Sequence, residues 1–331
     1  MDLDALTVAR KAEWERLDQL SSRRRLYGAE AEELVARYRA ASADLADMKT
    51  SVGRSKYADH LSTILARARL RLTDAPESLF RQLPRFFLLQ LPAALYRIRL
   101  LTAVIAALFL LTGILVSLWI AADPQLLASL GNQAELKKYA EEDFVNYYSD
   151  GPAIIFAGTV WTNNAWIAAQ CVLFGVTGIW PVYVLIQNAV SVGVAAGILT
   201  SFGHGDIFLQ YILPHGLLEL TCIFAAAAAG LRVFWAMVAP GPRKRSTAVA
   251  EEGRALATVA IGLVFALALS GVIEGFVTPQ PWPWQLKIVL GAVALAAFLA
   301  YMLVVGGRAY RSGETGDITE YEAGTPTLVT G

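Results

Sequence analysis

Long runs of apolar residues, separated by short polar segments, fill the chain from residue 100 onward. The first run, residues 100–122, carries no charge and is long enough to cross a bilayer as one helix at about 1.5 Å per residue. Residues 164–202 also lack charge and are long enough for two spans, or for a re-entrant pair, divided near Pro181. Three further runs are predicted as single spans: residues 208–238, 255–273 and 286–307. The pattern predicts an all-α, polytopic membrane protein with about six transmembrane helices.

Lysine and arginine residues between these runs determine the predicted orientation. The basic residues before the first span, after the fourth and after the sixth are Arg97 and Arg99, then Arg243, Lys244, Arg245 and Arg254, then Arg308 and Arg311. All three groups fall on one side if six helices cross the membrane, whereas the opposite loops contain Lys137 and Lys138 beside several acids. Because basic loops stay in the cytoplasm, both termini are predicted to be cytoplasmic.

Residues 1–78 alternate charged and apolar side chains at helical spacing and are predicted to form a cytoplasmic helical domain. Trp14, Leu17 and Leu20 mark the apolar face of a first helix, and Gly28 interrupts the pattern before a second one. The segment lacks the apolar core of a signal peptide, so we expect it to precede the first span in the cytoplasm. A coiled-coil surface for a partner is the alternative interpretation, although the apolar repeat is short.

The segment just before the first span has a different composition. Arginines alternate here with Phe86, Phe87 and leucines, and Pro84 and Pro92 interrupt a straight helix. Such a segment suits the cytoplasmic membrane interface, with aromatic rings among the acyl chains and arginines at the headgroups. The predicted organisation is a cytoplasmic helical domain (1–78), an interfacial amphipathic segment (79–99), a transmembrane domain (100–307) with an outer-face region (122–162), and a cytoplasmic tail (308–331).

Composition narrows the functional classes. The 331 residues are 56% apolar and 17% charged, with no formal net charge, which argues against a nucleic-acid-binding surface. Cys171 and Cys222 lie in apolar runs and are expected to be small buried residues, with a disulfide between them as the alternative. The sequence contains no CxxC or Cys/His cluster, no nucleotide-binding motif and no nucleophile with a convincing base. We therefore expect no metal, no cofactor and no enzymatic activity.

Ionisable residues within the apolar runs are the main candidates for a functional site. His215 and Glu219 lie four residues apart, on one face of a helix whose first turn would contain Pro214, and Glu274 lies at the end of the fifth span. A charge at the bilayer centre costs about 2.5–3.5 kcal/mol, so these side chains are expected to meet in a polar environment near the outer leaflet. The candidate polar intramembrane cluster consists of His215, Glu219, Glu274, Asn163, Asn164 and Asn188.

Three interpretations of this cluster are open. In the first, the polar side chains pair with one another and hold the helices together through contacts of about 0.6 kcal/mol each. In the second, they line an outward-facing cavity for a ligand, an ion or a partner segment. A metallohydrolase site is a third interpretation, but HExxH is absent and no second intramembrane histidine completes a ligand set.

Small residues recur in the spans, as in "GVAAG" (residues 193–197) and "AAAAAG" ending at Gly230. Such stretches let helix backbones approach closely, either within one chain or across a homodimer. The expected partners are the lipid bilayer and other membrane or envelope proteins, and a homodimer is among the arrangements that these residues allow.

Several of these segments resemble those of one bacterial family. The membrane segments "TNNAWIAAQCVLFGVTGIWPVYVLIQNAVSVG", "ILPHGLLEL" and "GVIEGFVTP" are similar to recurring segments of the stage II sporulation protein M family. The N-terminal "RKAEWERLDQL", "ELVARYRAASADLA" and "LSTILARARLRL" resemble that family's cytoplasmic helical region. One departure is visible, because "ARARLRL" lacks the histidine that related proteins tend to place after the Ala-Arg-Ala run.

The resemblance implies a bacterial inner-membrane protein. The family's namesake helps to position cell-wall hydrolases during engulfment and acts as a membrane scaffold without known catalysis. By this likeness, the chain is expected to be a non-enzymatic scaffold that recruits or positions partners, such as cell-wall or envelope remodelling factors. The alternative is a transporter, or another ligand- or ion-handling membrane protein, that uses the His/Glu/Asn cluster.

Overall fold

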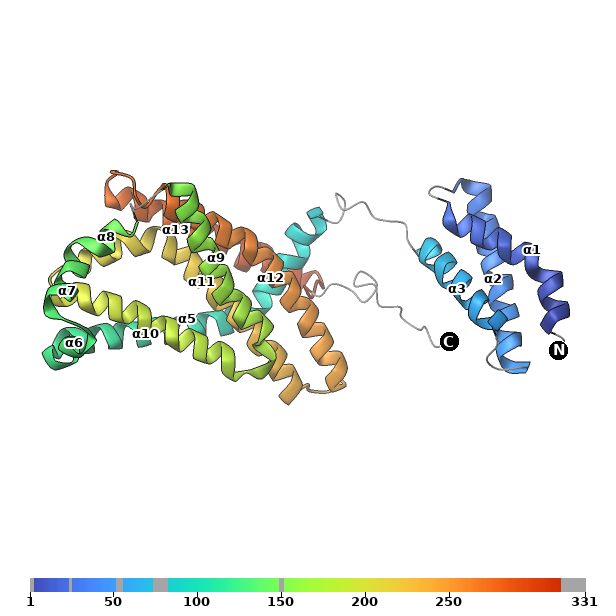
Figure 1. Ribbon diagram of the computed structural model, residues 1–331, viewed down its shortest axis with the longest axis horizontal. Coiled ribbons are helices and arrows are strands. Elements are labelled where there is room, and N and C mark those ends of the chain that lie inside the picture. Colours follow the sequence, from blue (N-terminus) through green and yellow to red (C-terminus); the bar gives the residue numbers. More distant parts are fainter. Residues whose placement is uncertain (1–2, 24–25, 52–55, 74–82, 149–151, 317–331) are drawn as a thin grey trace. The chain divides into compact units, whose positions relative to one another are not determined.

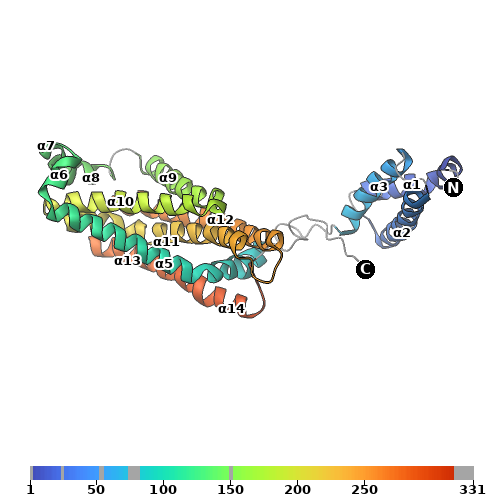
Figure 2. The ribbon, with the colours of Figure 1, turned by 90° about the horizontal axis from the view of Figure 1, so that it is seen from below.

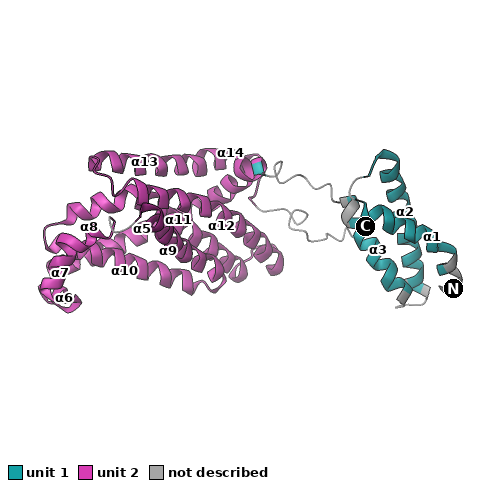
Figure 3. Cartoon of the chain, turned by 45° about the horizontal axis from the view of Figure 1, so that its top comes forward, with its two compact units in different colours: residues 1–83 teal, residues 84–331 magenta. Residues whose placement is uncertain are grey.

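The computed structural model describes residues 3–23, 26–51, 56–73, 83–148 and 152–316. The chain divides into two compact units, Met1–Leu83 and Pro84–Gly331, which we call the N-terminal unit and the membrane unit (Figure 3). All regular secondary structure in the described residues is helical, which confirms the predicted all-α class.

The described residues of the N-terminal unit form α1 (Leu3–Ser22), α2 (Gly28–Ser51) and α3 (Lys56–Thr73) (Figure 1). The predicted apolar face of the first helix is confirmed, because Trp14, Leu17 and Leu20 are buried in the core of this unit. Leu34 of α2 and Leu61 of α3 belong to the same core. The second helix begins at the glycine where the sequence pattern breaks. The N-terminal unit therefore has a hydrophobic core of its own.

The membrane unit is built from long helices that lie side by side in one bundle (Figures 1 and 2). Its long helices are α5 (Leu91–Ala122), α9 (Ala153–Leu173), α10 (Ile179–Ser201), α11 (Gly205–Val238), α12 (Arg245–Phe276) and α13 (Trp284–Ala300). Its short elements are η1 (Phe86–Gln90), α6 (Pro124–Leu130), α7 (Gln133–Lys138), η2 (Tyr139–Asp143), α8 (Phe144–Asn146), η3 (Gly175–Thr177), η4 (Tyr301–Val305) and α14 (Gly306–Arg311).

Five helical segments of the described chain are long and apolar enough to cross a membrane, which confirms the predicted polytopic class and comes close to the predicted number of spans. They are Leu83–Ala122, Ile179–Ser201, Gly205–Val238, Arg245–Phe276 and Trp284–Arg311. Helix α9 does not meet this criterion, although it packs against α11 and α12. Its polar residues, including adjacent asparagines, lower its hydropathy.

The helix boundaries between residues 152 and 201 differ from the prediction. The sequence pattern placed the start of the second span at residue 164, but α9 begins at Ala153 and therefore includes part of the predicted outer-face region 122–162. The break before α10 lies at residues 174–178, where Gly178 has a φ of 68°, and not at Pro181. Pro181 lies in the first turn of α10, where its missing N–H leaves no helical bond unmade.

The predicted interfacial segment, residues 79–99, divides between different elements. Residues 79–82 lie outside the described residues. From Leu83 onward the segment belongs to the helical segment Leu83–Ala122, in which η1 leads directly into α5, so the chain stays helical through Pro92 and into the first span. Of the predicted tail, residues 308–316 are described, and residues 317–331 are not.

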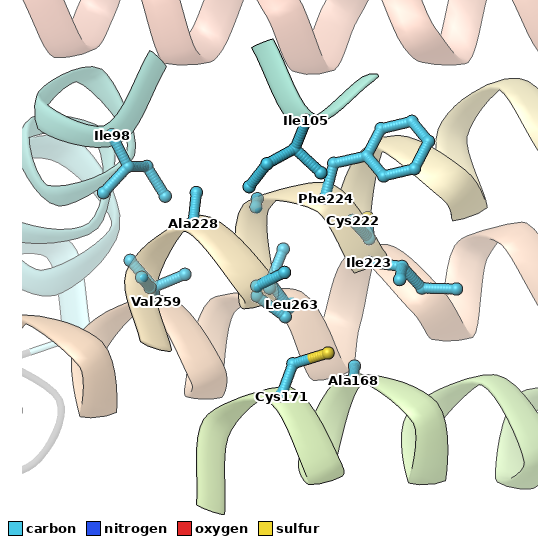
Figure 4. Close-up of a cluster of buried hydrophobic side chains, with 14 of the residues drawn as sticks. Ile98, Ile105, Ala168, Cys171, Cys222, Ile223, Phe224, Ala228, Val259 and Leu263 are labelled. Atoms are coloured by element: carbon cyan, nitrogen blue, oxygen red, sulfur yellow. The ribbon is translucent and has the colours of Figure 1, made fainter. Parts of the chain in front are cut away.

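Helix α11 is the centre of the bundle, since it contacts α5, α9, α10, α12 and α13. Figure 4 shows apolar side chains from α5, α9, α11 and α12 meeting around Ala228. Cys171 and Cys222 are both buried there as free thiols, which confirms their prediction as small buried residues. A Cβ atom on Gly230 would lie 2.2 Å from the carbonyl oxygen of Cys171, so α9 approaches the backbone of α11 directly.

The "GVAAG" stretch also packs within the chain. A Cβ atom on Gly193 would lie 2.7 Å from the carbonyl oxygen of Gly113, and one on Gly197 would lie 2.9 Å from Cβ of Ile120. Small residues of α10 thus allow close contact with α5. The sequence left open whether these small residues pack within one chain or across a homodimer. At Gly193 and Gly197 the contact is within the chain.

The basic residues predicted to share one side of the membrane lie at one end of the bundle. Nη2 of Arg97 is 2.6 Å from Oε1 of Glu252, which joins the start of α5 to the start of α12. The ring of Tyr96 contacts that of Tyr310 in α14, with ring centres 5.6 Å apart. The chain before the first predicted span, after the fourth and after the sixth therefore meets at this end, which we call the basic end.

Candidate functional site

His215 and Glu219 of α11 and Glu274 of α12 meet in the interior of the membrane unit, as the sequence predicted. Their exposed fractions are 4%, 9% and 3%. Nε2 of His215 lies 3.6 Å from Oε1 of Glu274, which joins the two helices. The i, i+4 spacing places His215 and Glu219 one turn apart on the face of α11 that contacts α12.

Two hydroxyl groups of the α12 segment, which the sequence analysis missed, complete the contact. Oγ of Ser270 donates to the carbonyl oxygen of His215 at 3.0 Å and lies 3.4 Å from Oε2 of Glu219. Oγ1 of Thr278 lies 3.4 Å from Nδ1 of His215. Both residues are fully buried. Ser270 lies four residues before Glu274 and so on the same face of α12, a spacing that could have identified it, whereas Thr278 lies in the turn just after α12.

Pro214 lies inside α11 and not in its first turn, which corrects the prediction, because α11 begins at Gly205. A proline at this position has no N–H for the carbonyl oxygen of Gln210, one turn earlier. Helix α13 approaches at this point, since a Cβ atom on Gly291 would lie 2.2 Å from the carbonyl oxygen of Pro214. The proline immediately before His215 therefore lies where two helix backbones are in close contact.

Lys287, near the start of α13, is a further buried charged residue that the sequence analysis missed. Its Nζ donates to the carbonyl oxygens of Thr278 and Gln280, at 2.8 and 3.2 Å, and so holds the turn between α12 and α13. The same nitrogen lies 5.4 Å from the ring centre of Tyr211. The sequence feature that could have identified Lys287 is its position as a single charge at the start of the apolar run 286–307.

The three predicted asparagines occupy different environments. Asn164 is buried in α9, and its side chain lies close enough to the carboxylate of Glu219 to interact with it, so a third helix joins the cluster. Asn163 is exposed and lines a surface groove on α9. Nδ2 of Asn188 donates at 2.8 Å to the carbonyl oxygen of Val184 in its own helix. The structure thus brings His215, Glu219, Glu274 and Asn164 together, and we call these four residues with Ser270 and Thr278 the polar cluster.

One carboxylate oxygen of the polar cluster is left without a partner. Oε2 of Glu274 is buried and makes no hydrogen bond within the described residues. Glu219 lies close enough to interact with Glu274 electrostatically. The described part of the chain has no group of three His, Cys, Asp or Glu side chains arranged to hold a metal ion. The arrangement can crosslink α9, α11 and α12, and Glu274 can also accept a proton or a hydrogen bond.

A second group of charges lies at the basic end and was not predicted as a cluster. Glu252 is buried and accepts from Nε and Nη2 of Arg232 at 3.0 and 2.9 Å, in addition to Arg97. Glu252 and Glu274 both belong to α12 and are separated by about 33 Å along the helix, at its usual rise per residue. That distance is close to the thickness of the hydrocarbon core, so the two clusters lie near opposite faces of the bilayer.

These features define a class of protein: an integral membrane protein with a multi-helix bundle, a buried polar cluster and a separate helical unit. Residues 106–279 match the sequence model of the stage II sporulation protein M family, and the chain belongs to that family. Residues 4–74 match a domain of unknown function (DUF8413). No curated protein and no solved structure matches the chain. The family match includes every residue of the polar cluster.

Proposed function

We propose that this protein is a non-enzymatic membrane scaffold that recruits or positions partner proteins, including factors that remodel the cell wall or envelope. The observation that supports a binding role is the N-terminal unit, which has its own core and exposes charged faces on all three helices. The membrane unit supports a structural role, because the side chains of its polar cluster are closed between helices. Separate binding and anchoring units are what a scaffold requires.

The location that we propose is a bacterial inner membrane, with both termini in the cytoplasm. Support comes from the basic end, where the arginines of α5, of the segment before α12 and of α14 gather. Under the positive-inside rule this end faces the cytoplasm. The polar cluster would then lie toward the outer leaflet.

Crosslinking in the membranes of cells that make the protein tests the scaffold proposal. Leu17 is 0% exposed in the core of the N-terminal unit, so Leu17→Asp should unfold that unit without touching the membrane unit. Lys11→Ala, at an exposed position of α1, is the matched control. We expect the wild type and Lys11→Ala to be crosslinked to the same specific proteins, and Leu17→Asp to lose them. Identical recovery with Leu17→Asp, or no specific partner for the wild type, would contradict the proposal.

A transporter is the second candidate, and the buried carboxylate oxygen of Glu274 that has no partner favours it. Intramembrane acids near a histidine are found in proton and ion pathways. In proteoliposomes, a transporter predicts proton or cation flux that Glu219→Gln abolishes while the thermal unfolding temperature stays unchanged. The scaffold predicts no flux above that of empty vesicles, and a change in unfolding temperature alone.

A further inference from the structure

We propose that a groove at the basic end of the membrane unit binds the headgroup of an anionic phospholipid. The groove lies between α5 and α11 and has a volume of about 530 Å³. Its polar lining includes Arg97, Arg232 and Arg243, and its apolar lining includes Leu100, Leu231 and Trp235. This proposal is independent of the scaffold and transporter candidates, because it concerns neither the N-terminal unit nor the polar cluster.

The charges of the groove leave an excess of arginine. Arg97 and Arg232 share the single carboxylate of Glu252, and Arg243 pairs with Glu251. Three guanidinium groups therefore face two carboxylates, so one positive charge stays unneutralised. Arg97 also donates to the carbonyl oxygen of Thr315, and Arg232 to that of Arg97. A guanidinium carries five N–H donors, and all these bonds together use only part of them. Donors and charge are thus available for a phosphate group, which arginine binds well.

The apolar lining indicates a lipid more than a soluble anion. The side chains of Leu100 and Trp235 are 70% and 64% exposed, as expected for residues that face acyl chains. Leu100 follows Arg97 into the first span, and Leu231 precedes Arg232, so leucines lie on the membrane side of these two arginines. Trp235 lies three residues after Arg232, toward the basic end of α11, at the level where tryptophan anchors are common. A phosphate with attached acyl chains matches this order of surfaces, whereas free phosphate would leave the apolar lining unused.

Lipid retention by the full-length protein tests this site. The protein is reconstituted in vesicles of equal parts phosphatidylcholine and phosphatidylglycerol, extracted in mild detergent, and its retained lipids are counted by native mass spectrometry. We expect the wild type to retain phosphatidylglycerol over phosphatidylcholine, and Arg243→Gln to weaken that preference about fivefold, as the loss of one basic group near the bilayer surface should. Arg311→Gln removes the same charge from an exposed position of α14 at the same end and should leave the preference unchanged.

Three results would overturn the proposal. Equal losses in Arg243→Gln and Arg311→Gln would indicate diffuse surface charge, and an Arg243→Gln protein that retains lipid like the wild type would exclude the groove. Displacement of phosphatidylglycerol by excess inorganic phosphate would indicate a site for a free anion.

A second variant checks that the preference follows the charge at the groove. Arg243→Glu reverses the charge at an exposed position before α12, where the packing of the bundle should not depend on it. We expect this variant to unfold at a temperature near that of the wild type and to lose its preference for phosphatidylglycerol more completely than Arg243→Gln. A folded Arg243→Glu protein with an unchanged preference would contradict the site.

Discussion

At the scale of single residues, His215 explains why an apolar chain places ionisable groups within its spans. Its imidazole contacts Glu274 and Thr278, and its carbonyl oxygen accepts from Ser270, so one residue of α11 meets three of the α12 segment. Each such contact contributes modestly in a membrane, about 0.6 kcal/mol on average. A buried carboxylate that loses its partner costs considerably more, and this asymmetry makes the histidine important for stability.

We predict that His215→Ala lowers the free energy of unfolding by about 3 kcal/mol, because it leaves the buried carboxylate of Glu274 without its histidine and opens a cavity. Thermal or denaturant unfolding of the purified protein in detergent measures this loss. Asn163→Ala is the control, since Asn163 is exposed and should change the stability by less than about 0.5 kcal/mol. Equal effects of the two substitutions would show that the polar cluster has no special structural role.

A second residue-scale prediction concerns the N-terminal unit. Glu33 binds Arg16 through two hydrogen bonds of 3.1 and 2.9 Å and Arg37 through one of 2.8 Å. These bonds, first those from Arg16, lower the pKa of Glu33 from 4.5 to about 2. Because the folded pKa is depressed, the stabilisation is fully present above pH 4.5 and is lost as the pH falls toward 2.

Hydrogen–deuterium exchange of the α1 and α2 peptides, corrected for the intrinsic rate at each pH, measures this loss in the full-length protein. Wild-type protection should decrease through that acidic range, and Glu33→Gln should show weaker protection at neutral pH with a smaller dependence on acid. Glu32→Gln, at an exposed neighbouring position, should behave as the wild type does. An unchanged acid response in Glu33→Gln would disprove the role of this ion pair.

At the scale of helices, close backbone contacts determine how the bundle packs. Gly230 of α11 allows contact with Gly175 and with the carbonyl oxygen of Cys171. We predict that Gly230→Ala destabilises the protein by about 1–3 kcal/mol, because the added methyl group meets backbone atoms that must move. Gly253→Ala in α12 is the matched control, since no atom lies within 4 Å of its Cβ position. Better helix propensity should leave Gly253→Ala neutral or up to about 1 kcal/mol more stable, and a reversed order in unfolding experiments would contradict the packing.

The sequence predicted the helices well where apolar runs were long, and less well where backbone geometry decides. The class, the spans of α5 and α11–α13, and the residues that join α11 to α12 followed from hydropathy and i, i+4 spacing. The break before α10 did not, because Gly178 rather than Pro181 permits the required turn. A proline signals a helix break only in a helix interior, and Pro181 lies in a first turn.

The candidate site was only partly predictable for a related reason. Hydropathy identifies which polar residues lie in spans, but it gives neither the neighbouring helix that each one faces nor its exposure. Asn163 and Asn164 are adjacent in sequence, yet only Asn164 reaches Glu219, since neighbouring residues of a helix point in different directions. The buried position of Lys287 was not predicted, because its partners are backbone carbonyl oxygens and no sequence motif identifies such contacts.

At the scale of the whole molecule, the chain joins two units of different construction. The N-terminal unit has a small core of leucines, Trp14 and Met48 with charged surfaces, whereas the membrane unit exposes apolar side chains and encloses its polar ones. Within the membrane unit, the groove at the basic end and the polar cluster lie at opposite ends of the bundle. The proposed lipid contact and the proposed partner binding can therefore be changed independently of each other.

The central claim, that the polar cluster is sealed inside the bundle, can be tested by thiol labelling. Ser270 is fully buried in the cluster, so Ser270→Cys places a thiol there with little change in size, and the native Cys171 and Cys222 are fully buried as well. Ser129→Cys, at an exposed position of α6, reports the rate for an open site.

The labelling rate of Ser270→Cys by a charged, membrane-impermeant thiol reagent, measured on the folded protein in nanodiscs, is therefore the most direct measurement. A closed cluster predicts no labelling until the protein is unfolded, while Ser129→Cys reacts at once. Labelling of folded Ser270→Cys at a rate near that of Ser129→Cys would show that water reaches the cluster, and it would contradict the structural role in favour of a transport pathway.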